Sequence, residues 1–103
     1  MRLVVVVVRP AQVEMVRQAL AGVHVTRLTV CDTQGYDPAI APGQVVQQTV
    51  LEIAVNDDFV ERTVDTLMTA LALRAEDVGT RLFVLPIDEA VQIYRDVRGP
   101  EAV

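Results

Sequence analysis

Few side chains of this 103-residue chain could act as a nucleophile, a general base or a metal ligand. His24 is the only histidine, Cys31 is the only cysteine, and the sequence contains no serine. No nucleophile stands at a spacing that would let His24 serve as its base, so we interpret His24 as a solvated turn residue. We interpret Cys31 as a small buried thiol on a strand. A metal site formed by Cys31 with His24 or Asp32 would need ligands from another subunit to complete its shell.

The carboxylates are scattered along the chain. Asp57 and Asp58 fit the start of a helix, where backbone amides favour negative charge. Glu52 interrupts an otherwise apolar strand, so it either faces water or makes a polar contact at a subunit boundary. An acylphosphatase-like enzyme would need a positioned arginine and asparagine, and Asn56, the only asparagine, has no such pairing. The sequence therefore favours a protein that is not an enzyme.

The sequence contains no glycine-rich phosphate motif of the Walker or Rossmann type. A nucleotide site would therefore be assembled from strand edges, loops and a neighbouring subunit. Backbone amides around Gly79 could form an anion-binding nest beside Arg81, but the spacing alone favours a plain glycine turn with a surface arginine. The candidate pieces of such a site are Thr29, Gly35, Val78, Gly79, Thr80, Arg81, Arg95 and Arg98.

The composition narrows the classes of partner. A net charge of −5 without a basic cluster argues against binding to nucleic acid, which relies on Lys and Arg to neutralise phosphates. The apolar run Leu3–Val8 is too short to span a bilayer and lacks the flanks of a signal peptide. A single cysteine agrees with a reducing compartment. We expect a cytoplasmic protein, either free or docked on a membrane protein.

A repeated pattern predicts the elements that position these residues. The apolar run Leu3–Val8 is followed by helical spacing, and Leu51–Val55 repeats the arrangement. Two strand-helix units in one small domain are typical of the split βαβ, ferredoxin-like architecture. We predict one α+β domain over residues 1–103, a βαββαβ sandwich with a four-stranded antiparallel sheet and two helices on one face. A chain of this size has a modest core, so its stability should depend on association.

The expected helices follow from apolar spacing and end signals. The first covers about residues 10–21 and ends at Gly22. The second opens with a capping box of Asp58 and Glu61 and ends near residue 73. Its predicted inner face consists of Phe59, Val60, Val64, Leu67, Met68 and Leu71.

The remaining segments are predicted strands and connections. Strands are expected over residues 2–9, 23–34, 45–55 and 81–87, with exposed loops over 35–44 and 74–80. Residues 88–94 are expected to form a helical turn and a short strand, and residues 95–103 a mobile or partner-docked tail.

Taken together, these residues resemble the PII signal-transduction proteins, and the resemblance covers most of the chain. It rests on the combination of several short motifs. They are Arg9-Pro10 with Val13-x-x-Val16-Arg17-x-Ala19-Leu20, Leu28-Thr29-Val30, Gln34-Gly35-Tyr36, Glu52-Ile53-x-Val55-x-Asp57-Asp58 and Arg81-Leu82-Phe83-Val84-x-Pro86.

The resemblance implies a homotrimer with adenine nucleotides, ATP or ADP, in the clefts between subunits. It also implies control of a membrane transporter or a metabolic enzyme, in nitrogen or carbon metabolism, through a flexible loop. Thr29, Gly35 with Tyr36, Glu52 and Arg81 match positions in or beside that cleft. Arg81 stands where the family has a phosphate-binding lysine.

The sequence also departs from the family pattern. The loop after Gly35 is shorter than in the main branch, Gln48 replaces an expected lysine, and Gln92 and Tyr94 replace two C-terminal arginines. Each lost charge-assisted contact removes about 1.5 to 3 kcal/mol from triphosphate binding. The candidate effectors are therefore ADP, ATP, AMP or a small anion such as bicarbonate, and the alternative is a site that binds no effector.

Two hypotheses follow from the sequence. The first is a regulatory trimer in which the effector orders mobile loops, so that one conformation fits a partner protein. The alternative is a structural or metal-linked trimer like the CutA group, which has no nucleotide site and in which Cys31 and His24 would matter more.

Overall fold

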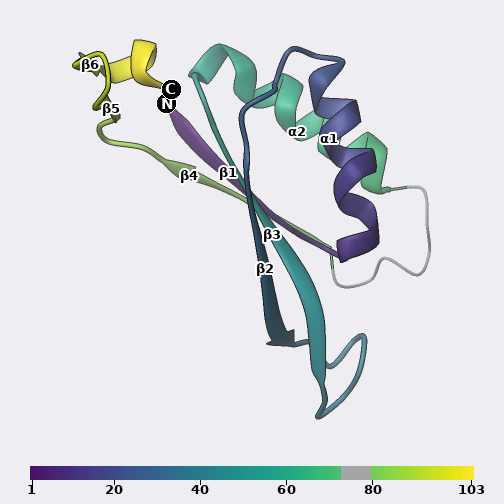
Figure 1. Cartoon of the computed structure of the whole chain (residues 1–103). Helices are drawn as coiled ribbons and strands as arrows, with labels where there is room; N and C mark the ends of the chain where they lie inside the picture. Colours follow the sequence, from purple (N-terminus) through teal and green to yellow (C-terminus); the bar gives the residue numbers. More distant parts are fainter. Residues whose placement is uncertain (73–79) are drawn as a thin grey trace.

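An antiparallel sheet with two α-helices on one face forms the body of the protein (Figure 1). The computed structural model describes residues 1–72 and 80–103. The elements are β1 (Arg2–Val8), η1 (Pro10–Gln12), α1 (Val13–Ala21), β2 (Thr29–Tyr36), β3 (Val45–Val55), α2 (Asp57–Leu71), β4 (Arg81–Pro86), β5 (Val91–Gln92), β6 (Val97–Arg98) and η2 (Gly99–Ala102). The main sheet has the order β2-β3-β1-β4, which confirms the predicted ferredoxin-like βαββαβ fold.

The valine-rich strand β1 lies in the centre of the sheet, between β3 and β4. Val4, Val6 and Val8 point to the helix side and are buried, whereas the alternate residues are half-buried on the other face. A strand that is apolar on both faces suits this position. Its register pairs Val5 with Glu52 of β3 and with Phe83 of β4.

The hydrophobic core lies between the helices and the sheet. Val16 and Leu20 of α1 and Leu67 and Leu71 of α2 are buried there. Burial of each such side chain contributes about 1.5 to 3 kcal/mol to the stability of the fold, because its apolar surface is removed from water. No helix among the described residues is long and apolar enough to cross a membrane.

The second face of the sheet has no helix over it in the described part of the chain (Figure 1). The strand registers place Leu3 and Val5 on this face together with Phe83 and Leu85. Phe83 is 50% exposed and Leu85 is 44% exposed. This uncovered sheet face is therefore largely apolar and open to solvent in the single chain.

The edge strand β2 corrects three predictions. It runs from Thr29 to Tyr36, so residues 23–28 are not a strand and Gly35 lies inside β2 instead of ending it. Cys31 is exposed, where the sequence had predicted a buried thiol. The reason is that β2 pairs only with β3 and is exposed at almost every position. The apolar residue Val25 is buried against the core although it lies outside the ladder.

The helix ends also differ from the predictions. The helix α2 begins at Asp57 with Asn56 as its N-cap, so the predicted capping box of Asp58 and Glu61 is wrong. Met68, predicted on the inner face, is 61% exposed, and Thr63 occupies the core instead. A hydrogen bond from Thr63 Oγ1 to the Phe59 carbonyl, at 2.7 Å, satisfies that buried hydroxyl.

The first helix is shorter than predicted because residues 10–12 form the separate 3-10 turn η1. It ends at Ala21, and its C-cap Gly22 keeps a right-handed φ of −63°. The left-handed conformation falls instead on His24, with φ 67°. His24 is exposed in this turn, as the sequence predicted.

The C-terminal region is a small hairpin followed by a 3-10 turn. Residues 88–90 are not helical, so the expected helical turn is wrong, whereas a short strand appears as β5. The expected tail over residues 95–103 contains β6 and η2. The connection predicted over residues 74–80 lies outside the described residues, except for Thr80.

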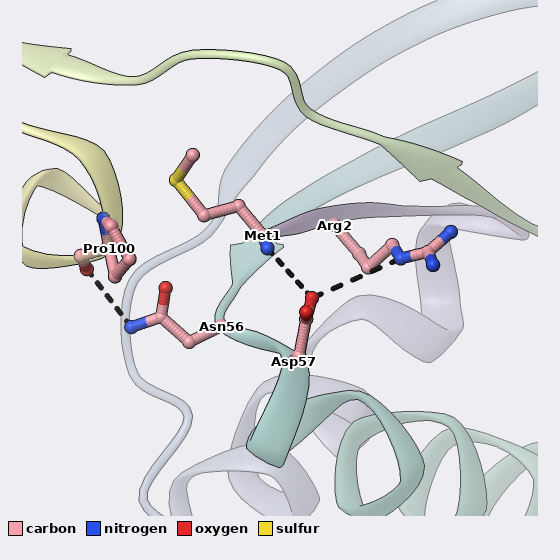
Figure 2. A network of polar contacts seen from close by, with 5 residues as sticks. All are labelled: Met1, Arg2, Asn56, Asp57 and Pro100. Carbon is pink, nitrogen blue, oxygen red and sulfur yellow. Dashed lines mark hydrogen bonds and ion pairs between the residues drawn. The ribbon is translucent and has the colours of Figure 1, made fainter.

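Polar contacts join both ends of the chain to the start of α2 (Figure 2). The Met1 ammonium group donates to Asp57 Oδ1 at 2.7 Å, and Arg2 Nε lies 4.0 Å from the same oxygen. Asn56 Nδ2 donates to the Pro100 carbonyl at 3.0 Å. The helix start thus fixes the first strand and the C-terminal turn in one place.

The contact with Met1 makes Asp57 a pH-dependent contributor to stability. The hydrogen bond and the charge of the Met1 ammonium group lower the pKa of Asp57 below its ordinary 3.8. Such a carboxyl group stabilises the fold fully at pH values above the pKa that it has in the unfolded chain. This contribution is lost as the pH falls through the lower pKa that the group has in the folded protein. We expect Asp57→Asn to lower the free energy of unfolding slightly at neutral pH and to match the wild type in strong acid.

Urea denaturation at neutral and acidic pH measures this difference. Asp58→Asn is the matched control, because it removes a carboxylate from the same helical turn without touching Met1. Equal losses for the two variants at neutral pH would mean that the Met1 contact contributes nothing.

Candidate functional site

Thr29 and Glu52, two predicted site residues, lie side by side. The register of β2 and β3 pairs them directly, and Glu52 is half-buried on the uncovered sheet face. They line a cavity of about 190 Å³ whose other walls are Leu3, Arg27, Leu28, Ala54, Ala102 and Val103. No ion pair to Glu52 is found within residues 1–72 and 80–103. Its carboxylate is therefore available to a ligand or to a neighbouring chain.

A second cavity of about 250 Å³ shares Arg27, Ala54 and Val103 with the first. Its wall includes Asn56, whose Oδ1 atom is buried and has no hydrogen-bond partner in the described structure. The two cavities together offer a guanidinium donor, a carboxylate and an amide acceptor. A polar ring or a sugar with several hydroxyls matches such a set of donors and acceptors.

Arg81 lies at the start of β4, and its side chain is 59% exposed. Its Nη2 atom forms an ion pair with Asp37 Oδ2 at 3.7 Å. Thr80 and Arg81 also line a cavity of about 240 Å³ beside the C-terminal half of α2. Val78 and Gly79 fall outside the described residues, so the anion nest proposed for them stays a prediction.

Gly35 lies opposite Val46 near the end of the β2–β3 hairpin. A side chain here would collide with Gln48, because a Cβ atom on Gly35 would lie 2.3 Å from Gln48 Oε1. Tyr36 follows with 71% of its surface exposed. Gly35 thus leaves room for the Gln48 amide, and Tyr36 is open to a partner.

The variant Gly35→Ala tests how firmly Gln48 is held. Because the clash involves the end of a flexible side chain, Gln48 should rotate away, and we expect a loss of less than about 1 kcal/mol. Thermal denaturation measures the effect, and the double variant with Gln48→Ala should regain the wild-type stability. A much larger loss that Gln48→Ala does not relieve would contradict the role given to Gln48.

The arginines Arg95 and Arg98 belong to the β5–β6 hairpin. Arg98 Nη1 donates to Glu89 Oε1 at 2.7 Å, and Arg95 Nε donates to Gln92 Oε1 at 2.9 Å. The hairpin follows the end of β4 near the two chain termini, whereas Arg81 begins β4 (Figure 1). A single chain therefore does not bring these arginines together with Arg81.

Metal binding through His24 and Cys31 receives no support from the arrangement of the described residues. Within residues 1–72 and 80–103, no three His, Cys, Asp or Glu side chains are grouped closely enough to hold a metal ion.

Sequence reasoning missed two residues of these sites, Asp37 and Arg27. Asp37 precedes Pro38, and an Asp-Pro pair after a strand is a signal for a turn in which the carboxylate binds backbone amides. Arg27 was assigned to a strand, although it lies in the irregular segment before β2.

Known proteins are similar to this chain in sequence and in fold. The family model described as "Nitrogen regulatory protein P-II" matches residues 1–97. The nitrogen regulatory protein GlnK1 of Methanosarcina mazei is 30% identical, over 100% of this chain and 97% of its own length. The nitrogen regulatory protein P-II of Rhizobium etli is 27% identical, over 100% of both chains.

A solved structure agrees with this relationship. The crystal structure of Arabidopsis thaliana PII bound to citrate superposes with a TM-score of 0.82 at 28% identity. The match covers 98% of this chain and 87% of that one.

Proposed function

Because this chain belongs to the nitrogen regulatory protein P-II family, we propose that it is a trimeric sensor that binds a small anionic effector in the clefts between its subunits. The effector class is an adenine nucleotide, ADP, ATP or AMP, with bicarbonate as the small-anion alternative. The bound state regulates a partner protein, either a transporter or a metabolic enzyme.

The uncovered sheet face is the main observation in support of this proposal. Its apolar side chains, among them Phe83 and Leu85, remain open to water in one chain, and a patch of this kind marks an interaction surface. Packing of three such faces against each other would bury it. Glu52 lies on the same face, beside the cavity that Thr29 lines, so a neighbouring chain would close that cavity.

The separation of the predicted ligand-binding arginines within one chain also supports a site that is shared between two subunits. Arg81 and the pair of Arg95 and Arg98 lie at opposite ends of β4 in one chain (Figure 1). A neighbouring copy can supply the missing cations to a phosphate that one chain contacts only through Arg81. The region near Thr29 would then receive the base or ribose.

The β2–β3 hairpin is the proposed contact with the partner protein. It extends beyond the rest of the sheet, away from the helices (Figure 1). Tyr36, Ile40 and Val45 near its end are 71%, 40% and 48% exposed. Exposed apolar residues on a projecting loop are typical of a surface that binds another protein.

Calorimetric titration with ATP, ADP, AMP, cyclic AMP and bicarbonate tests the proposed effector class. We expect a saturable signal from at least one member of this panel. Silence across the whole panel would contradict the sensor function. Silence accompanied by a metal-dependent rise in melting temperature would favour the CutA-like alternative.

A further inference from the structure

We propose that the ion pair between Asp37 and Arg81 acts as a latch, which holds the loop of residues 37–44 between β2 and β3 in place. The ion pair breaks when an anionic ligand binds the Arg81 guanidinium. This inference rests on the proposed function, because it says how binding of an effector to Arg81 would change the conformation of the hairpin that is proposed to bind the partner protein. The observation behind it is the ion pair of 3.7 Å between Asp37 Oδ2 and Arg81 Nη2.

Asp37 organises the first turn of the loop. Its Oδ1 atom accepts a hydrogen bond from the Ala39 amide at 3.0 Å. Its carbonyl oxygen accepts the amides of Ile40 and Ala41, each at 3.0 Å. The Asp37 side chain therefore supplies one of the three hydrogen bonds of this turn, and its main chain accepts the other two.

The Asp37 carboxylate depends on a cation nearby. Its side chain is only 10% exposed, and a carboxylate removed from water needs a partner of opposite charge. Among the described residues, Arg81 forms the ion pair with it. If Arg81 turns to another anion, Asp37 must move towards water, and its contact with the Ala39 amide is lost with that movement.

The pair is also weak enough to be displaced. Arg81 is 59% exposed, and its distance to Asp37 exceeds that of a hydrogen bond. A phosphate, with more than one charge and several acceptor oxygens, competes well for the same guanidinium.

Amide hydrogen exchange without a ligand provides the first test. In Arg81→Gln, the amides of Ala39, Ile40 and Ala41 should exchange about tenfold faster than in the wild type, because the turn opens more often. Arg62→Gln is the matched control, since Arg62 is an exposed arginine on α2 that stacks on Phe59. Equal exchange in the wild type and Arg81→Gln would overturn the latch.

Titration with ADP and with inorganic phosphate provides the second test. Saturating ADP should speed the exchange of the same three amides in the wild type. Asp37→Asn, which removes the competing charge, should bind ADP up to about fivefold more tightly. ADP binding that changes neither exchange nor the affinity of Asp37→Asn would overturn the latch and leave the proposed function intact. No binding of either ligand by the wild type would overturn the latch, and the proposed function would fall with it only if ATP, AMP and bicarbonate also failed to bind.

Discussion

Replacing Phe83 by aspartate should convert the proposed trimer into single chains. Phe83 lies on the uncovered sheet face, opposite Val5 in the register of β1 and β4. In a trimer formed through this face, each substitution would bury an unpaired carboxylate, which costs several kcal/mol. Light scattering after size exclusion should give three times the 11.3 kDa chain mass for the wild type and a single chain mass for Phe83→Asp.

Met68→Asp on α2 is the matched control for this experiment. Met68 is an apolar residue with 61% exposure, compared with 50% for Phe83, but it lies on the helix layer. Its variant should keep the mass of the wild type. If Phe83→Asp also kept that mass, the trimer would not be formed through the sheet face.

The second large effect concerns Arg81 and the charge of the ligand. Loss of a charge-assisted hydrogen bond costs about 1.5 to 3 kcal/mol, so Arg81→Gln should weaken ADP binding about tenfold or more. Adenosine has no phosphates, and any binding of adenosine should not change in this variant. Calorimetry with ADP and with adenosine separates the contribution of the phosphates to the binding free energy from that of the nucleoside.

The arginine Arg62 again supplies the control for a general loss of positive charge. Arg62→Gln should bind ADP like the wild type, because Arg62 stacks on Phe59 on the helix side of the fold. Equal weakening in Arg62→Gln and Arg81→Gln would indicate a diffuse electrostatic effect and would remove the specific role of Arg81.

Apolar runs and helical apolar spacing predicted the main elements well. The strand Val45–Val55 has the predicted bounds, and β1 differs from its prediction at one end. Val16 and Leu20 of the first helix are in the core as expected. These elements are determined locally, because a short apolar run favours a central strand and helical apolar spacing allows only one face of a helix to meet the core.

Features that depend on tertiary contacts were not visible in the sequence. Asp57 begins α2 beside the Met1 ammonium group, and no local signal places the chain start there. Cys31 is exposed because β2 is an edge strand, which depends on strand order and not on its own residues. Val25 is buried by packing outside the ladder, so its alternation with Arg27 suggested a strand that does not form.

The candidate site was predicted only in part for the same reason. Thr29 and Glu52 were both proposed, and the β2–β3 register places them together. The pairing of Asp37 with Arg81 joins two segments far apart in the chain, which spacing alone cannot reveal. The distance between Arg81 and the β5–β6 hairpin likewise became clear only from the strand arrangement.

A titration of ADP into the wild type and into Phe83→Asp under identical conditions shows whether the pocket is shared between chains. We expect one saturable site per chain in the wild type and no binding by the monomeric variant, because the pocket needs a neighbouring chain. Equal affinity of the wild type and the monomeric variant would contradict this expectation, since the site would then lie within one chain.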